Sequence, residues 1–507
     1  MYSAAASWLM TTLDPHPVMV SLVQVATTLP MVLFAVPAGA LADIIDKRRY
    51  LLAVEIGVAV VSAIFAALVM RDLVTPASLL VFMFIVSCGT ALDAPAWQSI
   101  VPQLVPRQDL SAAVAANSVG INISRAVGPA LSGAITATLG VAAPFWIDAA
   151  SNFATIGALL WWRRPPGAGN RPLPAERLGS AIRAGVRYAR NNPPLRATLL
   201  RCIAFCLFAS AYWALLPLLA RSQIGGGPGV YGLLLGAIGA GAVSAAFVLP
   251  RLKGMLGPDR LVAAGTIGTA LAMVLYAIAH DMGTALAASL IAGACWIACL
   301  STLNVSAQLA LPEWVRGRGL AIYVTILFGA ISLGSALWGE VAAAAGLPLA
   351  HLIASAGALI AIPLTWHWRL RSSAGLDLTP SMHWPEPVLA EDLEPSQGPV
   401  MVTVEYRVSS SNREAFLAAL DRVAAERRRD GAFAWGVFED AAQPGRYVET
   451  FFVESWMEHL RQHERVTRSD RLQQEKLEAL LLSPTKVTHL VAARPDQREG
   501  APAPGLQ

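Results

Sequence analysis

Two ionisable residues, Arg125 and Asp148, stand inside long apolar stretches of the sequence, where a charge is costly to bury. An acid and a base brought together in such surroundings can take up and release protons, or can form a purely structural ion pair. At about 1.5 Å of rise per residue, two adjacent helices would hold both residues at a similar depth. We therefore expect Asp148 and Arg125 to pair across adjacent helices and to form a proton-coupling site. The neutral polar residues beside them would be Asn117, Asn122 and Asn152.

Other chemistries find less support in the sequence. Glu55 is a second candidate for coupling, but its side chain can also reach the aqueous boundary. The five cysteines lie in apolar runs without histidine or carboxylate neighbours, which indicates helix packing. His459 and His463 are one helical turn apart, but Leu460 stands where a zincin has glutamate. The sequence also contains no glycine-rich nucleotide loop, so we do not expect direct use of ATP. No metal and no cofactor are expected.

These residues require apolar helices to position them. The chain has 507 residues, of which 55% are hydrophobic and only 14% are charged. Many of its apolar runs exceed the roughly 18 residues that predict a membrane-spanning helix. We predict an all-α polytopic membrane protein with twelve spans, at 1–13, 18–42, 50–70, 77–98, 112–139, 143–162, 197–220, 230–250, 260–280, 284–308, 318–345 and 347–366.

The connections between these spans differ in charge. Apart from Arg71 and Arg221, their arginines and lysines fall on one side of the membrane. Because positively charged loops remain in the cytoplasm, both termini are expected there.

The sequence also repeats itself. A shift of 206 residues aligns Gly128–Gly133 with Gly334–Gly339. Two related halves of six helices predict a binding site between them, near the middle of the membrane. By the same shift, the counterpart of the seventh span would begin upstream of Met1, so we expect a truncated first helix and a longer natural N-terminus.

The character of the sequence changes after Trp366. A linker rich in proline and acidic residues leads into a densely charged segment in which strand and helix patterns alternate. The predicted elements are a strand at Val400–Val408, a helix at Arg413–Arg429, strands at Ala432–Phe438 and Tyr447–Val453, a helix at Trp456–Leu482 and a strand at Lys486–Ala492. This β-α-β-β-α-β order predicts an α+β ferredoxin-like domain.

Residues 39–49, with the sequence GALADIIDKRR, resemble the loop between the second and third helices of the major facilitator superfamily. The resemblance implies a cytoplasmic latch that breaks when the inner gate opens. In this latch Asp93 would face the basic residues 47–49, and Asp43 would face the start of the eleventh helix near Arg318. The residues assigned to this gate are Gly39, Asp43, Lys47, Arg48, Arg49 and Asp93.

The segment GPALSG resembles a signature of the fifth helix in antiporters and exporters of the same superfamily. Its small residues permit close helix approach and its proline bends the helix, which predicts a hinge at Gly128, Pro129 and Gly133. Ordinary close packing is the alternative. The arginine often found in the fourth helix of proton-coupled drug exporters has no counterpart between Leu79 and Gln98.

An apolar, aromatic pocket with a few polar groups is expected between the two halves, and it would suit an amphipathic organic substrate. The predicted cavity residues are Trp8, Gln24, Tyr212, Trp213, Trp296, Asn304, Gln308 and Tyr323.

Longer stretches, including DAPAWQSIVPQLVPRQDL and LPEWVRGRGLA, resemble the enterobactin-exporter and transmembrane secretion effector branch of the superfamily. The C-terminal segment resembles an antibiotic biosynthesis monooxygenase-like dimeric α/β barrel. The resemblance implies a transporter, not an enzyme: a proton-coupled exporter of a siderophore- or antibiotic-like compound, working by alternating access in the bacterial cytoplasmic (inner) membrane. Two alternatives remain, a transporter fused to a cargo-modifying enzyme and an uptake permease.

The predicted parts are an N-terminal half (1–164), a basic cytoplasmic loop (165–196), a C-terminal half (197–368), a linker (369–399), a soluble cytoplasmic domain (400–492) and a disordered tail (493–507). The expected partners are a small-molecule substrate, protons and the lipid bilayer, and no nucleic acid. A homodimer formed through the C-terminal domain is a further candidate.

Overall fold

The computed structural model describes residues 1–104, 110–161, 178–312, 314–370, 379, 381, 394 and 397–493. It divides into two compact units. The first contains residues 1–175, 197–308 and 320–372, and the second contains 176–196, 309–319 and 373–507. Most of the predicted linker and the predicted tail lie outside the described residues.

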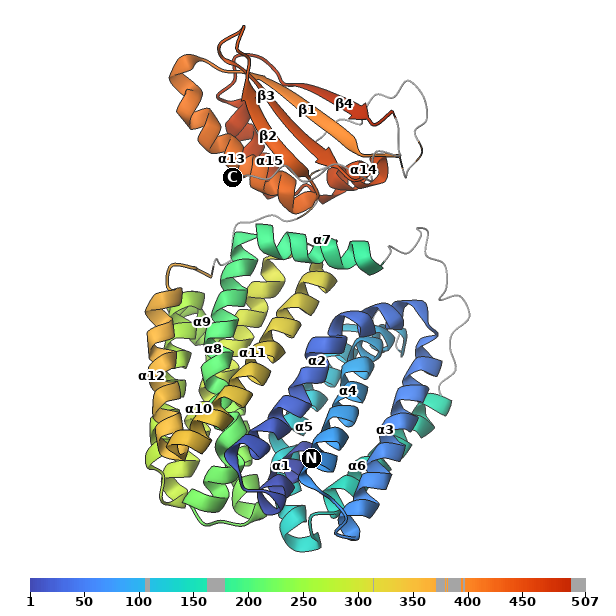
Figure 1. Cartoon of the computed structure of the whole chain (residues 1–507), viewed down its shortest axis with the longest axis vertical. Helices are drawn as coiled ribbons and strands as arrows, with labels where there is room; N and C mark the ends of the chain where they lie inside the picture. Colours follow the sequence, from blue (N-terminus) through green and yellow to red (C-terminus); the bar gives the residue numbers. More distant parts are fainter. Residues whose placement is uncertain are drawn as a thin grey trace. The chain divides into compact units, whose positions relative to one another are not determined.

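The first unit is helical (Figure 1). Its helices are α1 (Tyr2–Leu13), α2 (Pro17–Ile44), α3 (Lys47–Met70), α4 (Pro76–Leu104), α5 (Leu110–Leu139), α6 (Ala143–Trp161), α8 (Pro193–Leu218), α9 (Pro228–Ile278), α10 (Met282–Leu309), α11 (Arg316–Ala345) and α12 (Leu347–Thr365). A π-helical turn, η2 (Leu219–Gln223), extends α8. Among the described residues, eight helices are long and apolar enough to cross a membrane.

Helix α9 covers two of the predicted spans. Gly257 interrupts it with φ 70° and ψ 170°, a conformation open to glycine but strained for other residues. Pro258 follows, and its fixed φ angle suits the first position of a new helix. The predicted separation of 230–250 from 260–280 therefore coincides with a real break.

Small residues allow the closest helix contacts of this unit. A β-carbon added to Gly133 in α5 would overlap the backbone of Gly232 in α9. A β-carbon added to Gly339 in α11 would overlap Ser21 in α2. Gly133 and Gly339 are equivalent under the 206-residue shift, so the two repeats pack through the same position.

The second unit contains a four-stranded antiparallel sheet. Its C-terminal elements are β1 (Val400–Arg407), the short 3₁₀ turn η3 (Ser410–Asn412), α13 (Arg413–Asp430), β2 (Phe433–Glu439), β3 (Arg446–Val453), α14 (Trp456–Arg465), α15 (Arg468–Glu478) and β4 (Lys486–Val491). The strand order is β2-β3-β1-β4. Alternate residues of β1, among them Val402 and Val404, pack with Phe416 and Leu420 of α13, as a sheet with one covered face requires.

The prediction of one continuous helix at Trp456–Leu482 is wrong, because the structure has two helices there, α14 and α15. Val466 is extended, with φ −63° and ψ 125°, and separates α14 from α15. Thr467 and Asp470 then form a capping box, in which each side chain accepts a hydrogen bond from the other's backbone amide. The Thr-x-x-Asp spacing thus marks the start of a second helix within a segment whose sequence pattern predicts a single helix.

The second unit also includes a helix that the sequence analysis did not predict, α7 (Leu178–Asn191). Its buried positions, Gly185, Tyr188 and Ala189, recur at helical spacing. Arg183 and Arg190 are exposed. Part of the predicted basic loop is therefore an amphipathic helix.

Candidate functional site

Three of the predicted cavity residues form one aromatic cluster. Tyr212 and Trp213 come from α8, and Trp296 comes from α10. The ring centroid of Trp213 lies 5.5 Å from that of Tyr212 and 5.5 Å from that of Trp296. Phe205, about two turns before Tyr212 on α8, lies 5.8 Å from Trp296. We call these four residues the aromatic cluster.

The cluster carries polar atoms with unused hydrogen-bonding capacity. The Tyr212 hydroxyl and the Trp213 indole nitrogen have no hydrogen-bond partner among the described residues. The hydroxyl of Tyr323, another predicted cavity residue, also has none among them. A buried polar group without a partner is costly, so a bound solute with polar groups would be stabilised here. Apolar walls with a few such donors fit an amphipathic molecule.

The remaining predicted cavity residues are placed differently. On α10, the Gln308 side-chain amide donates to the Asn304 side-chain oxygen at 2.6 Å, and both residues are exposed. Gln24 is half-buried on α2. Trp8 is 6% exposed, and its ring stacks on Tyr231 of α9 at 6.2 Å.

Trp8 belongs to a set of contacts at one end of the helices. The Arg221 guanidinium lies 6.0 Å from the Trp8 ring centroid and donates to the Thr11 hydroxyl at 3.3 Å. These contacts join α1 to the connection between α8 and α9. The glycine contacts described above, Gly133 with Gly232 and Gly339 with Ser21, are made near the same ends of their helices. We call all these contacts together the closed end.

Asp148 has a clear local partner. The Ser62 hydroxyl of α3 donates to its carboxylate at 2.8 Å, which joins α3 to α6. The side chains of Arg125, Asn117 and Asn122 lie outside the described residues, so the expected pairing of Asp148 with Arg125 stays a prediction. The Asn152 amide nitrogen is buried without an acceptor among the described residues. Glu55 is half-buried on α3.

The predicted latch region is organised around the start of α3. The Asp46 carboxylate accepts from the Arg49 backbone amide at 3.0 Å and caps the helix. The Arg48 guanidinium donates to the carbonyl oxygens of Leu159 at 2.7 Å and Leu160 at 2.6 Å, at the C-terminal end of α6. A cation is favoured at that end of a helix because the carbonyls there are unpaired.

The carbonyl partners of Arg48 could not be predicted from the sequence.

Among the other predicted gate residues, one oxygen of Asp93 is buried without a hydrogen-bond partner among the described residues. The side chain of Asp43 is not described, so the contacts expected of Asp43 and the roles of Gly39 and Lys47 stay predictions. In the predicted hinge, α5 continues through Gly128 and Pro129, and Gly133 makes the contact with Gly232 described above.

A second cluster holds the C-terminal domain to α7 and to the segment 309–319 within the second unit. Arg187 of α7 forms an ion pair with Glu458 of α14 at 3.3 Å. The Arg465 guanidinium lies 4.5 Å from the ring centroid of Trp314, which meets Tyr188 edge-on at 5.7 Å. The Tyr188 hydroxyl donates to the Ala310 carbonyl at 3.1 Å. We call these residues the docking cluster.

Two groups in the C-terminal domain have displaced pKa values. Burial, followed by the nearby Asp470, raises the pKa of Glu426 to about 8. Burial, followed by the neighbouring His489 and His463, lowers the pKa of His459 to about 3. Across the part of the chain that the structure describes, no group of three or more His, Cys, Asp or Glu residues is arranged to hold a metal ion.

Comparison with known proteins adds the family. A family model described as transmembrane secretion effector matches residues 1–496, which includes the C-terminal sheet. The Staphyloferrin A transporter of Staphylococcus aureus is 24% identical over 338 residues, 65% of this chain and 82% of its own length. The Enterobactin exporter EntS of Salmonella choleraesuis is 28% identical over 255 residues, 50% of this chain and 60% of its own length.

The match to the MFS-type transporter YfiS of Bacillus subtilis, at 26% identity, covers 48% of this chain and 57% of that relative. Among solved structures, a POT family transporter in complex with 5-aminolevulinic acid aligns with a TM-score of 0.59 at 12% identity, over 72% of this chain and 92% of its own. A bacterial homolog of the lysosomal transporter Spinster, inward-facing and unoccupied, gives 0.55 at 14% identity, over 72% and 94%. These likenesses show the fold.

Proposed function

The chain belongs to the transmembrane secretion effector family of major facilitator transporters, and from this premise we propose that it exports a small amphipathic organic compound, siderophore- or antibiotic-like, from the cytoplasm. Export is coupled to protons and proceeds by alternating access. In this proposal twelve membrane helices form two halves of six, and both termini face the cytoplasm. The single observation that carries the substrate class is the aromatic cluster with its unpartnered polar atoms.

Two relatives suggest the cargo. They are a staphyloferrin A transporter and an enterobactin exporter, and a third relative, from Mycolicibacterium fortuitum, is the multidrug efflux pump Tap. The amphipathic compound that we propose combines apolar or aromatic parts with polar groups. The aromatic cluster offers the complementary combination, because rings bind the apolar part while the Tyr212 hydroxyl and the Trp213 nitrogen bind oxygen atoms.

The closed end supports a state that is open to the cytoplasm. Gly133 lies near the last turn of α5, Gly232 near the first turn of α9, and Arg221 in the connection between α8 and α9. Under the charge bias of the connections, these positions face away from the cytoplasm. In this state the latch around Arg48 and Asp93 would be released, which agrees with the α6 carbonyl partners of Arg48.

Export is tested first in cells. The compounds released into the medium by a deletion strain are compared with those of its parent and of a strain carrying the chain again. The proposal expects one amphipathic compound to be lost on deletion and restored on complementation. The compound is then supplied to inside-out membrane vesicles, where a proton gradient should drive its accumulation.

The aromatic cluster is tested in the same vesicles. Trp213→Ala should raise the KM for the identified compound several-fold, because it removes a ring and a donor from the cluster. Trp161→Ala is the matched control, since this indole is 87% exposed and contacts no part of the cluster. Equal kinetics of the two variants would refute the assignment of the site, while accumulation in right-side-out vesicles alone would favour the uptake permease.

We propose that the C-terminal domain is a regulatory and dimerisation module. The family match runs through this domain, and the docking cluster holds it to α7 and to the segment 309–319. The alternative, a cargo-modifying enzyme, is tested by incubating the purified full chain with the identified compound or with a quinol. Turnover of either would favour the enzyme.

The dimer is expected to form through the uncovered face of the sheet. Phe433 is 45% exposed, Phe438 is 62% exposed, and Phe452 pairs with Phe433 on the same face. Such a set of exposed aromatic residues suits a second copy of the chain. Mass photometry of the full chain should give a dimer, and Phe438→Asp should give a monomer. A monomeric unsubstituted chain would contradict this part of the proposal.

A further inference from the structure

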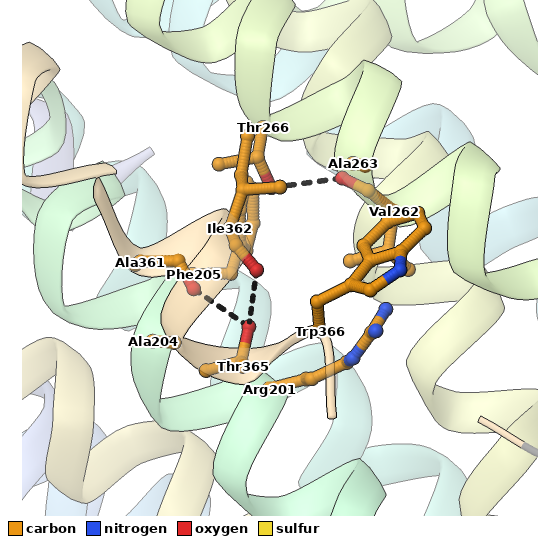
Figure 2. Close-up of a pocket in the computed structure, with 10 residues that line it drawn as sticks. All are labelled: Arg201, Ala204, Phe205, Val262, Ala263, Thr266, Ala361, Ile362, Thr365 and Trp366. Carbon is orange, nitrogen blue, oxygen red and sulfur yellow. Dashed lines mark hydrogen bonds between the residues drawn. The ribbon is translucent and has the colours of Figure 1, made fainter. Parts of the chain in front are cut away.

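A second site, a pocket that shares only Phe205 with the aromatic cluster, lies between α8, the second part of α9, and α12 (Figure 2). Its empty volume is ≈ 310 Å³, part of which opens to the outside. The walls are largely apolar and aromatic, and include Val262, Ile362 and Trp366. The hydroxyls of Thr266 and Thr365 donate to carbonyls of their own helices, at 2.8 Å and 2.7 Å, and are therefore satisfied.

The charged group of this pocket is Arg201, which is only 3% exposed. One terminal nitrogen, Nη1, contacts a carboxylate oxygen of Asp259 at 3.0 Å. That same oxygen also accepts from the Leu370 backbone amide at 2.9 Å. The other two guanidinium nitrogens, Nε and Nη2, are buried with no hydrogen-bond partner among the described residues.

Two buried N–H donor groups of Arg201 therefore lack an acceptor among the described residues. A purely structural ion pair between Arg201 and Asp259 explains Nη1 and leaves Nε and Nη2 unexplained. Burying unpaired donors of a cation is costly, and a guanidinium can present two parallel donors to the oxygens of one phosphate group. The Trp366 ring lies 5.6 Å from the guanidinium carbon and covers the group, as Figure 2 shows.

We propose that the pocket binds the phosphate group of an anion, with Arg201 Nε and Nη2 donating to its oxygens and the apolar walls holding any hydrocarbon part. Two sources share this chemistry, the headgroup of an anionic phospholipid and free inorganic phosphate. The pocket lies near the start of α8, near the start of the second part of α9 and at the end of α12. On the predicted topology this is the headgroup level on the cytoplasmic side, where tryptophan and basic residues gather in membrane proteins.

The test uses the purified full chain in a neutral detergent. Its Tm is measured after addition of phosphatidylglycerol, of phosphatidylcholine, or of millimolar inorganic phosphate. A lipid site predicts that phosphatidylglycerol raises the Tm by about 3 °C or more, and that the other two additions do not. An equal rise with inorganic phosphate would assign the site to the free anion. No rise with either anion would overturn the proposal.

Three variants separate this site from general charge effects. Arg201→Gln should abolish the rise in Tm. Asp259→Asn should increase it, because the guanidinium loses a competing carboxylate while the asparagine oxygen still accepts from Leu370. Arg251→Gln removes the same charge from an exposed position and should leave the rise unchanged. The gain expected for Asp259→Asn cannot arise from misfolding, so equal responses of all three variants would also overturn the proposal.

Discussion

The hydrogen bond from Ser62 to Asp148 shows how little of the contacts around a predicted coupling residue can be inferred from residue types alone. The sequence identifies Asp148 because a carboxylate stands in an apolar stretch. It does not identify Ser62, because that contact depends on which faces of α3 and α6 meet. Arg48 is similar: its basic character is evident in the sequence, whereas its carbonyl partners at the end of α6 arise from tertiary packing.

Asp148→Asn should uncouple transport from protons. The amide oxygen still accepts from Ser62, so the contact between α3 and α6 persists, but the group no longer exchanges a proton. We expect proton-driven accumulation in inside-out vesicles to fall by an order of magnitude or more, while binding of the compound is kept. Ser62→Ala is the control for loss of the hydrogen bond alone. Normal proton-driven export by the Asn variant would contradict the assignment of Asp148.

Glu426→Gln should change the pH dependence of stability. The pKa of Glu426 is about 8 in the folded chain, against an ordinary value of 4.5. Between these values the folded state binds the proton more strongly, so the free energy of unfolding falls as the pH rises from about 4.5 to about 8. The Gln variant stays neutral and should lose this decline, as measured by hydrogen exchange of α13 in the full chain. Glu475→Gln, at an exposed site, should keep it.

Helices were more predictable than the contacts between them. Each predicted span overlaps a helix of the structure, because long apolar runs favour helical hydrogen bonding in lipid. Eight of the described helices are long and apolar enough to cross a membrane. Helix α7 was missed because its buried face is short and interrupted by arginines, and because its partners lie far away in the sequence. The break at Val466 was missed because the residues on both sides favour helix.

Gly133→Leu should prevent the closed end from forming. The added side chain would overlap Gly232, so we expect transport to stop while the protein still reaches the membrane. A cysteine placed at Tyr231 should then react with a membrane-impermeant maleimide added outside. Gly157→Leu is the control, because nothing lies within 4 Å of a β-carbon at that position. Equal labelling in both variants would argue against a gating role for Gly133.

Gly339→Leu provides the test of the repeat. This glycine occupies the equivalent position in the second half and contacts Ser21. If the two halves rock about equivalent contacts, its effect on labelling should match that of Gly133→Leu.

At the scale of the whole molecule, the second unit is built from three separated parts of the chain, 176–196, 309–319 and 373–507. The sequence predicts the C-terminal domain from its composition and its strand pattern. It does not predict the docking cluster, because Tyr188, Trp314 and Arg465 are more than a hundred residues apart and share no motif. Only the folded chain brings them together.

Arg187→Glu should loosen the docking cluster. The new carboxylate would face Glu458, replacing an ion pair at 3.3 Å by repulsion between two half-buried charges. Hydrogen exchange of α7 should rise by about tenfold, which corresponds to about 1.4 kcal/mol of lost protection. Arg183→Glu makes the same charge change at an exposed position of the same helix. If both variants exchange alike, the ion pair does not hold α7.

The segmented second unit also sets an order for the synthesis of the protein. Residues 176–196 and 309–319 leave the ribosome before the C-terminal domain, so Tyr188 and Trp314 emerge without the surfaces that later bury or contact them. The second unit is therefore complete only when the C-terminal domain folds onto segments made much earlier. A chain that ends prematurely would leave both aromatic residues without the C-terminal domain's arginines over their rings and open to proteases, which makes the final domain a checkpoint on complete translation.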